Sequence, residues 1–152
     1  MAEIRIEKAE PVRVAYVELV GPYEDWGKGL MNLVSWLKAN NVRMAGPPIG
    51  PYYDNPLENP ADRLRSEACV PISGTVRPGR GIKVKDLPGG QVAVTRHRGP
   101  PEKYTDTYGS FLEGLLKEGY TPAGPAWEVF DEPREDLRSG MGIAIKQPIG
   151  KT

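Results

Sequence analysis

Residues 12–37, VRVAYVELVGPYEDWGKGLMNLVSWL, contain a strand, a stop signal and a helix in direct succession. The first nine residues are mostly apolar and rich in valine, which predicts a buried strand over 12–20. The glycine-proline pair that follows ends the strand, because proline lacks the backbone N–H that a sheet ladder needs. Beyond this pair the apolar residues fall at helical spacing, which predicts a helix over about 23–39.

The same order returns in the second half of the chain. Residues 91–98 (QVAVTRHR) predict a strand, and a helix is predicted over about 102–118. One constant shift aligns the two stop signals and the two helical stripes: Gly21-Pro22 with Gly99-Pro100, Trp26 with Tyr104, Leu33 with Phe111, and Leu37 with Leu115. We therefore predict an internal duplication, with repeats at about 3–73 and 81–149.

Each predicted repeat is a strand-helix-strand-strand unit. The remaining strands are predicted over 3–8, 66–73, 82–86, 125–131 and 140–148, and the proline-rich stretch 47–51 predicts a loop. Two such units give one α+β domain over residues 1–152, with a mainly antiparallel sheet, two helices on one face and a central cleft. A cleft between duplicated halves is the expected ligand pocket.

The composition argues against several classes of protein. Twenty basic and 20 acidic residues cancel, which disfavours direct DNA binding and binding to anionic membranes. No apolar run is long enough to cross a membrane. The single cysteine, Cys69, cannot form an internal disulfide and fits a reducing compartment, so we expect a cytoplasmic protein.

Four polar or reactive positions receive plain interpretations. Cys69 has no activating neighbour and is expected to be a packed thiol rather than a nucleophile. His97 lies between two arginines and is expected at the surface rather than as a haem ligand, so we expect no cofactor and no metal. Arg63 and Arg65 are expected to be solvated partners of Glu58, Asp62 or Glu67.

Four motifs, in this order along the chain, resemble one known family. They are Gly-Pro-Tyr at 21–23, Tyr-Tyr-Asp-Asn-Pro at 52–56, Gly-Pro-Pro at 99–101 and Trp-Glu-Val-Phe-Asp-Glu-Pro at 127–133. Over nearly its whole length the chain resembles the GyrI-like small-molecule-binding domain, also called the AraC-type or bacterial transcription activator effector-binding domain. The family fold is the duplicated unit predicted above. Family regulators fuse this domain to a DNA-binding segment, whereas this chain resembles a stand-alone member.

The resemblance also implies a ligand site. In the family a buried glutamate in the strand after the second helix faces a hydrophobic, often cationic ligand, and the matching position is Glu128. A carboxylate in an apolar strand is costly to desolvate unless it is paired, and a lipophilic cation among aromatic rings can pair with it. The last strand carries no aromatic residue, which departs from family binders and predicts a more open pocket. The expected ligand-binding residues are Glu128, Trp127, Phe130, Tyr53, Trp26, Tyr104 and Tyr108.

Two alternatives to simple binding stay open. Some members of the family hydrolyse electrophilic molecules such as strained cyclopropanes, which would make Glu128 a general base and Tyr104, Tyr108 or Tyr53 a proton donor. The family name comes from an inhibitor of DNA gyrase, which implies a protein partner, either gyrase or a separate regulator. We rank ligand binding first and metal-free hydrolysis second, so we expect a binding protein rather than an enzyme.

Overall fold

The computed structural model describes residues 4–54, 58–74, 76–79, 81–97, 104–129 and 143–151, without the side chains of Glu24, Tyr104 and Thr105. The chain forms two compact units. Unit 1 is Met1–Glu10 together with Gly89–Thr152, and unit 2 is Pro11–Pro88. Neither helix of the described chain has the length and apolarity that a membrane span needs.

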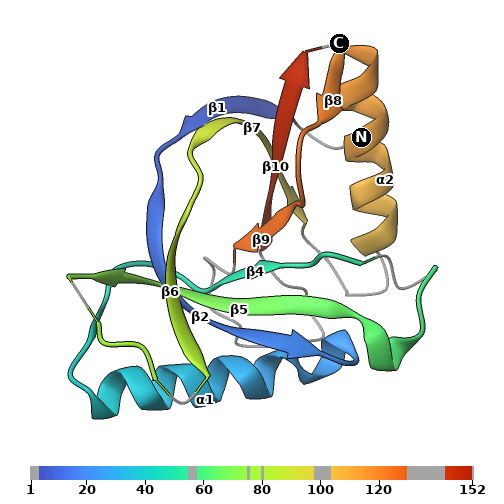
Figure 1. Cartoon of the computed structure of the whole chain (residues 1–152). Helices are drawn as coiled ribbons and strands as arrows, with labels where there is room; N and C mark the ends of the chain where they lie inside the picture. Colours follow the sequence, from blue (N-terminus) through green and yellow to red (C-terminus); the bar gives the residue numbers. More distant parts are fainter. Residues whose placement is uncertain are drawn as a thin grey trace. The chain divides into compact units, whose positions relative to one another are not determined.

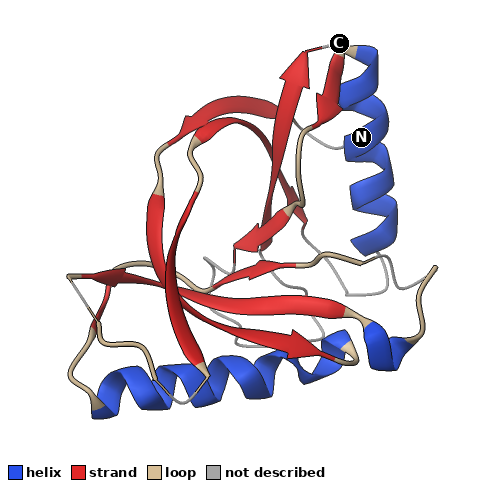
Figure 2. Ribbon diagram, in the orientation of Figure 1, coloured by secondary structure: helices blue, strands red, loops and turns tan. Residues whose placement is uncertain are grey.

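Unit 2 packs one helix, α1 (Trp26–Ala39), on one face of antiparallel strands (Figures 1 and 2). A single 3-10 turn, Tyr23–Asp25, leads into the helix. The strands are β2 (Val12–Val20), β3 (Arg43–Met44), β4 (Ile49–Pro51), β5 (Arg65–Ser73) and β6 (Ile82–Leu87). Strand β2 lies between β5 and β6, and β5 also pairs with β4 and β3.

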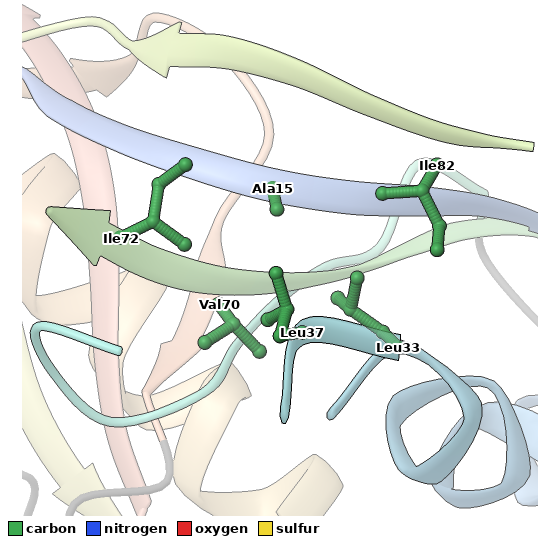
Figure 3. Packing of buried hydrophobic residues seen from close by; sticks show 6 residues of the cluster. All are labelled: Ala15, Leu33, Leu37, Val70, Ile72 and Ile82. Carbon is green, nitrogen blue, oxygen red and sulfur yellow. The ribbon is translucent and has the colours of Figure 1, made fainter. Parts of the chain in front are cut away.

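The core of unit 2 lies between α1 and the strands. Leu33 and Leu37, one helical turn apart, are fully buried and point toward β5 (Figure 3). Burying each of these leucines stabilises the fold by about 1.5–3 kcal/mol. The sheet contributes alternate residues to this core, namely Ala15, Val70, Ile72 and Ile82. Successive side chains of a strand point to opposite faces. The chain neighbours of these core residues, such as Tyr16 and Cys69, therefore lie on the face away from α1.

Unit 1 has the same general plan. Its helix is α2 (Tyr104–Lys117), and its strands are β1 (Arg5–Ala9), β7 (Gly90–His97), β8 (Tyr120–Pro122), β9 (Trp127–Val129) and β10 (Ile143–Lys151). The order is β1-β7-β10-β9, with β8 paired to the end of β10, and every pair is antiparallel. Phe111 and Leu115 of α2 are fully buried against Ala93, Ile145 and Ile149.

The first strands of the two predicted repeats pair across the expected boundary. Strand β1, which precedes β2 in the chain, pairs with β7, and β6, which precedes β7, pairs with β2. Each unit therefore takes one strand from the other predicted repeat. The duplication itself stays a prediction.

The structure confirms the α+β class and antiparallel pairing, and it corrects one local prediction. The proline-rich stretch 47–51 is not all loop, because Ile49–Pro51 forms β4 and all three residues are buried. The two prolines before Ile49 lie outside the strand, where their missing N–H groups cost no ladder hydrogen bond. The predicted stop at Gly99-Pro100 lies outside the described residues.

Candidate functional site

A short segment after β4 is fixed to β5 by an aspartate. The Asp54 carboxylate accepts hydrogen bonds from the backbone N–H of Arg65 (2.8 Å) and from its guanidinium Nε and Nη2 (both 2.9 Å). These hydrogen bonds lower the pKa of Asp54. The Tyr53 N–H donates to the Arg65 carbonyl (3.0 Å), and the Tyr23 hydroxyl donates to the Asp54 carbonyl (2.6 Å). The Tyr-Tyr-Asp motif thus holds Tyr53 beside β5.

Tyr53 meets a buried carboxylate, that of Glu67 on β5. Glu67 is only 9 % exposed, and its Oε1 lies 2.5 Å from the Lys85 ammonium. Burial and a hydrogen bond with Glu67 raise the pKa of Tyr53, which therefore keeps its proton. The Lys85 ammonium also lies 4.3 Å from the centroid of the Tyr16 ring. In this cluster a carboxylate, a cation and two tyrosines gather on one face of unit 2.

Trp26 is bound to the same glutamate through the main chain. Its indole Nε1 donates to the Glu67 carbonyl at 2.8 Å, and the side chain is 7 % exposed. Gly50 of β4 lies against the indole, where a Cβ would come within 3.2 Å of the ring. Trp26 is therefore closely packed at the edge of the Glu67 cluster.

A second polar cluster lies in unit 1 beneath α2. Glu128 is half-buried and lies opposite Ile145, which belongs to the core under the helix. Directly opposed residues of an antiparallel pair share one face, so Glu128 lies on the side covered by α2. Burial, and then the charge of Glu128, raise the pKa of Tyr108. The Tyr108 hydroxyl donates to Oε1 of the buried Gln147 at 3.0 Å.

Buried polar side chains extend this second cluster. The Gln147 amide nitrogen donates to the carbonyls of Gly124 (2.8 Å) and Pro148 (2.9 Å). His97 is fully buried, and its Nδ1 lies 2.8 Å from Oγ1 of Thr107 on α2. The expectation of a surface histidine is therefore wrong. Strand alternation explains it, because His97 shares the helix-covered face with Ala93 while the flanking Arg96 points the other way.

The structure brings the expected site residues together in two groups. In unit 1, Glu128 lies close enough to Tyr108 for its charge to raise the Tyr108 pKa. In unit 2, Trp26 and Tyr53 both bind Glu67, Trp26 at the main-chain carbonyl and Tyr53 at the carboxylate. Trp127 is buried. Because it is next to Glu128 along β9, its side chain points to the opposite face of the strand. Phe130 and the Tyr104 side chain lie outside the described residues. Their roles, like those of the whole set, stay predictions.

Sequence reasoning missed Glu67. It was expected to be a solvated partner of Arg65, but Arg65 pairs with Asp54, and Glu67 pairs with Lys85. The signal was present in the parity of the strand, because Glu67 is two residues from the apolar Cys69 within the run SEACV. Cys69 is buried, as predicted.

Comparison with known proteins gives a family and close relatives. The model of the GyrI-like small molecule binding domain matches residues 2–144. The chain is 30 % identical over 125 residues to the DNA gyrase inhibitor of Pectobacterium carotovorum, covering 80 % of both chains. It is also 30 % identical over 132 residues to the DNA gyrase inhibitor of Escherichia coli K12, covering 84 % of this chain and 80 % of that protein.

Solved structures share the fold at low identity. The EcmrR C-terminal domain matches with a TM-score of 0.85 at 14 % identity, covering 100 % of this chain and 99 % of that domain. This chain spans 58 % of the longer EcmrR chain in an EcmrR–DNA complex. A hydrolase from Listeria innocua matches with a TM-score of 0.70 at 12 % identity, covering 97 % of this chain and 92 % of that chain. SAV2435 bound to tetraphenylphosphonium matches with a TM-score of 0.65 at 10 % identity, covering 97 % of this chain and 94 % of that chain.

Proposed function

Because the chain belongs to the GyrI-like small molecule binding domain family, we propose that it binds an amphipathic aromatic cation and that Glu128 recognises the positive charge. The observation that carries the proposal is a half-buried carboxylate near a protonated tyrosine, on the α2-covered face of the strands and beside the apolar core that contains Phe111 and Ile145. SAV2435, which has the same fold, is bound to tetraphenylphosphonium, a lipophilic aromatic cation. The cleft between the repeats stays part of the prediction.

The chemistry of the cluster supports this ligand class. A cation that enters an apolar layer loses its water, and a carboxylate that has already lost part of its own water compensates that loss best. The Tyr108 ring supplies an apolar wall, and its hydroxyl proton is committed to Gln147. Cation–π attraction would add about 1–2 kcal/mol in such a dry setting.

Replacing Glu128 with glutamine is expected to remove the preference for a cation and to leave the binding of a neutral analogue unchanged. The measurement is a tryptophan fluorescence titration with tetraphenylphosphonium and with neutral triphenylphosphine oxide. We expect the cation to lose roughly tenfold in affinity, the equivalent of about 1.4 kcal/mol. Glu113→Gln is the matched control, because Glu113 lies in the same unit with a side chain that is 71 % exposed. Equal cation affinity in the parent and in Glu128→Gln would contradict the proposal.

Hydrolysis is the second candidate, and the Glu128–Tyr108 pair favours it. A carboxylate can activate water as a general base, while a tyrosine whose pKa is raised retains its proton, which it would redirect from Gln147 to a leaving group. A Listeria innocua hydrolase has the same fold. With an electrophilic cyclopropane as substrate, an enzyme forms more than one equivalent of product, and Glu128→Gln stops product formation while binding persists.

The names of the relatives support a third candidate. Two proteins that are 30 % identical to this chain over most of their length are DNA gyrase inhibitors. A protein partner would then replace or accompany the small molecule. Retention of purified gyrase subunits on the immobilised chain would favour this candidate over the other two.

A further inference from the structure

We propose that Glu67, Tyr16 and Tyr53 form a cation site in unit 2, which Lys85 occupies until an organic ammonium ligand displaces it. The inference rests on the proposed function for its ligand class, but it uses other residues. It assigns to Lys85 the role of a tethered occupant that competes with the ligand.

The sheet register places these groups on one face. Lys85 of β6 lies opposite Val14 of β2, and two residues further along β2 lies Tyr16, opposite Cys69 of β5. Glu67 is two residues from Cys69, so its side chain shares that face, away from α1. The Lys85 side chain therefore crosses β2 diagonally, passes over the Tyr16 ring and reaches Glu67.

The position of the Lys85 ammonium is that of a bound cation. It lies 2.5 Å from the carboxylate oxygen of Glu67 and 4.3 Å from the centroid of the Tyr16 ring. An ion paired with a buried carboxylate over an aromatic face is the arrangement by which proteins recognise ammonium ligands. Tyr53 also holds this carboxylate through a hydrogen bond. The wall of the site includes Ile49, a buried residue of β4 that lies opposite Cys69 of β5.

The site has an open side through which Lys85 can leave. The Lys85 side chain is 30 % exposed, and Tyr53 is 38 % exposed, whereas the Glu67 side chain is 11 % exposed. A lysine ammonium is strongly hydrated and sits on a flexible stem, so it regains favourable hydration free energy when it returns to water. An alkylammonium carrying an aromatic group is less hydrated and adds apolar contact, so it is the favoured occupant.

A pair on the same strands provides the internal control. Lys83 of β6 contacts Glu18 of β2, and the two side chains are 57 % and 56 % exposed. An exposed ion pair of this kind contributes little to the stability of the fold, and it offers no buried carboxylate to a ligand. Lys83 and Lys85 are two residues apart on one face of β6, so they share their charge and their strand but not the proposed role.

The first test uses the unaltered chain and benzyltrimethylammonium as the probe. Surface lysines are acetylated with a water-soluble acetylating reagent, and the rate at each site is measured by mass spectrometry with and without the probe. We expect saturating probe to speed acetylation of Lys85 several-fold, because displacement exposes the amine, while Lys83 stays unchanged. Protection of Lys85 by the probe, or an unchanged rate while the probe is shown to bind, would overturn the proposal.

The second test removes the tethered occupant. Lys85→Met keeps an apolar stem without the charge, and it should bind benzyltrimethylammonium roughly tenfold more tightly if Lys85 fills the site about nine-tenths of the time. Lys83→Met should bind as the parent does, and Glu67→Gln combined with Lys85→Met should lose the gain. Circular dichroism confirms that each variant is folded before titration. A gain of equal size in Lys83→Met would overturn the proposal, since net charge alone would then explain it.

The two proposals fail in different ways. If Glu128→Gln abolishes the cation preference while Lys85→Met binds no more tightly than the parent, the Lys85 site is wrong and the proposed function stands. If Lys85→Met binds the probe more tightly and Glu128→Gln has no effect, the Lys85 site stands and the role of Glu128 is wrong. If no cation binds the parent or Lys85→Met, both proposals are overturned.

Discussion

Replacing Phe111 with alanine is expected to lower the free energy of unfolding by about 3–5 kcal/mol, the usual cost of removing a buried phenylalanine. Phe111 is fully buried and packs with Ala93, Leu115 and Ile145 in the core of unit 1. Two of these neighbours come from paired strands that cannot move toward the helix without breaking their ladder, so the cavity stays largely open. Urea unfolding followed by circular dichroism measures the loss.

Two further substitutions in α2 sharpen this test. Leu116→Ala removes a side chain of the same helix that is 58 % exposed, and it should change the free energy of unfolding by no more than about 0.5 kcal/mol. Phe111→Leu keeps most of the volume and should cost about 1–1.5 kcal/mol. A Phe111→Ala variant as stable as Leu116→Ala would show that this core is not packed as described.

Alkylation of Cys69 by iodoacetamide at pH 8 is expected to be at least about thirtyfold slower in the native chain than in the urea-unfolded chain. Burial, and then the charge of Glu67, raise the pKa of the Cys69 thiol from its ordinary 9.0 to about 12. The thiolate fraction at pH 8 then falls about a thousandfold, and the greater nucleophilicity of a more basic thiolate restores only part of that loss. Mass spectrometry of the single-cysteine chain gives both rates.

The same shift gives a dependence of stability on pH. The thiol keeps its proton longer in the folded chain, so its contribution to stability is complete below pH 9 and is lost as the pH rises toward about 12. A Cys69→Ala variant should therefore lose less stability than the parent between pH 9 and pH 11. Equal alkylation rates in the native and unfolded chains would contradict the burial of Cys69.

The helices and the long strands could be predicted because their patterns are local. The alternation in residues 12–20 and the stripe that includes Leu33 and Leu37 specify β2 and α1 without reference to distant residues. Strand β4 could not be predicted, because three residues are too few for a period, two prolines precede them and the third residue is itself a proline. The partner of β1 could not be predicted either, since alternation shows which face is buried but not which strand lies alongside.

The candidate site was predictable only in part. The aromatic residues and Glu128 were proposed from motifs, which are local. Glu67 was missed because its buried state depends on Lys85, a residue on another strand, whose ammonium reaches across β2. His97 was missed for a similar reason: its chain neighbours are arginines, but its neighbour in space is Thr107.

The way the chain is divided between the two units sets an order for folding during synthesis. Unit 2 is one continuous segment, whereas unit 1 joins the first ten residues to everything after residue 88. All strands of unit 2, including β6, are synthesised before β7 exists. Strand β1 leaves the ribosome first, yet it must wait for β7, its partner in the sheet. A circular permutant that begins at Pro11 would make both units continuous and end that wait.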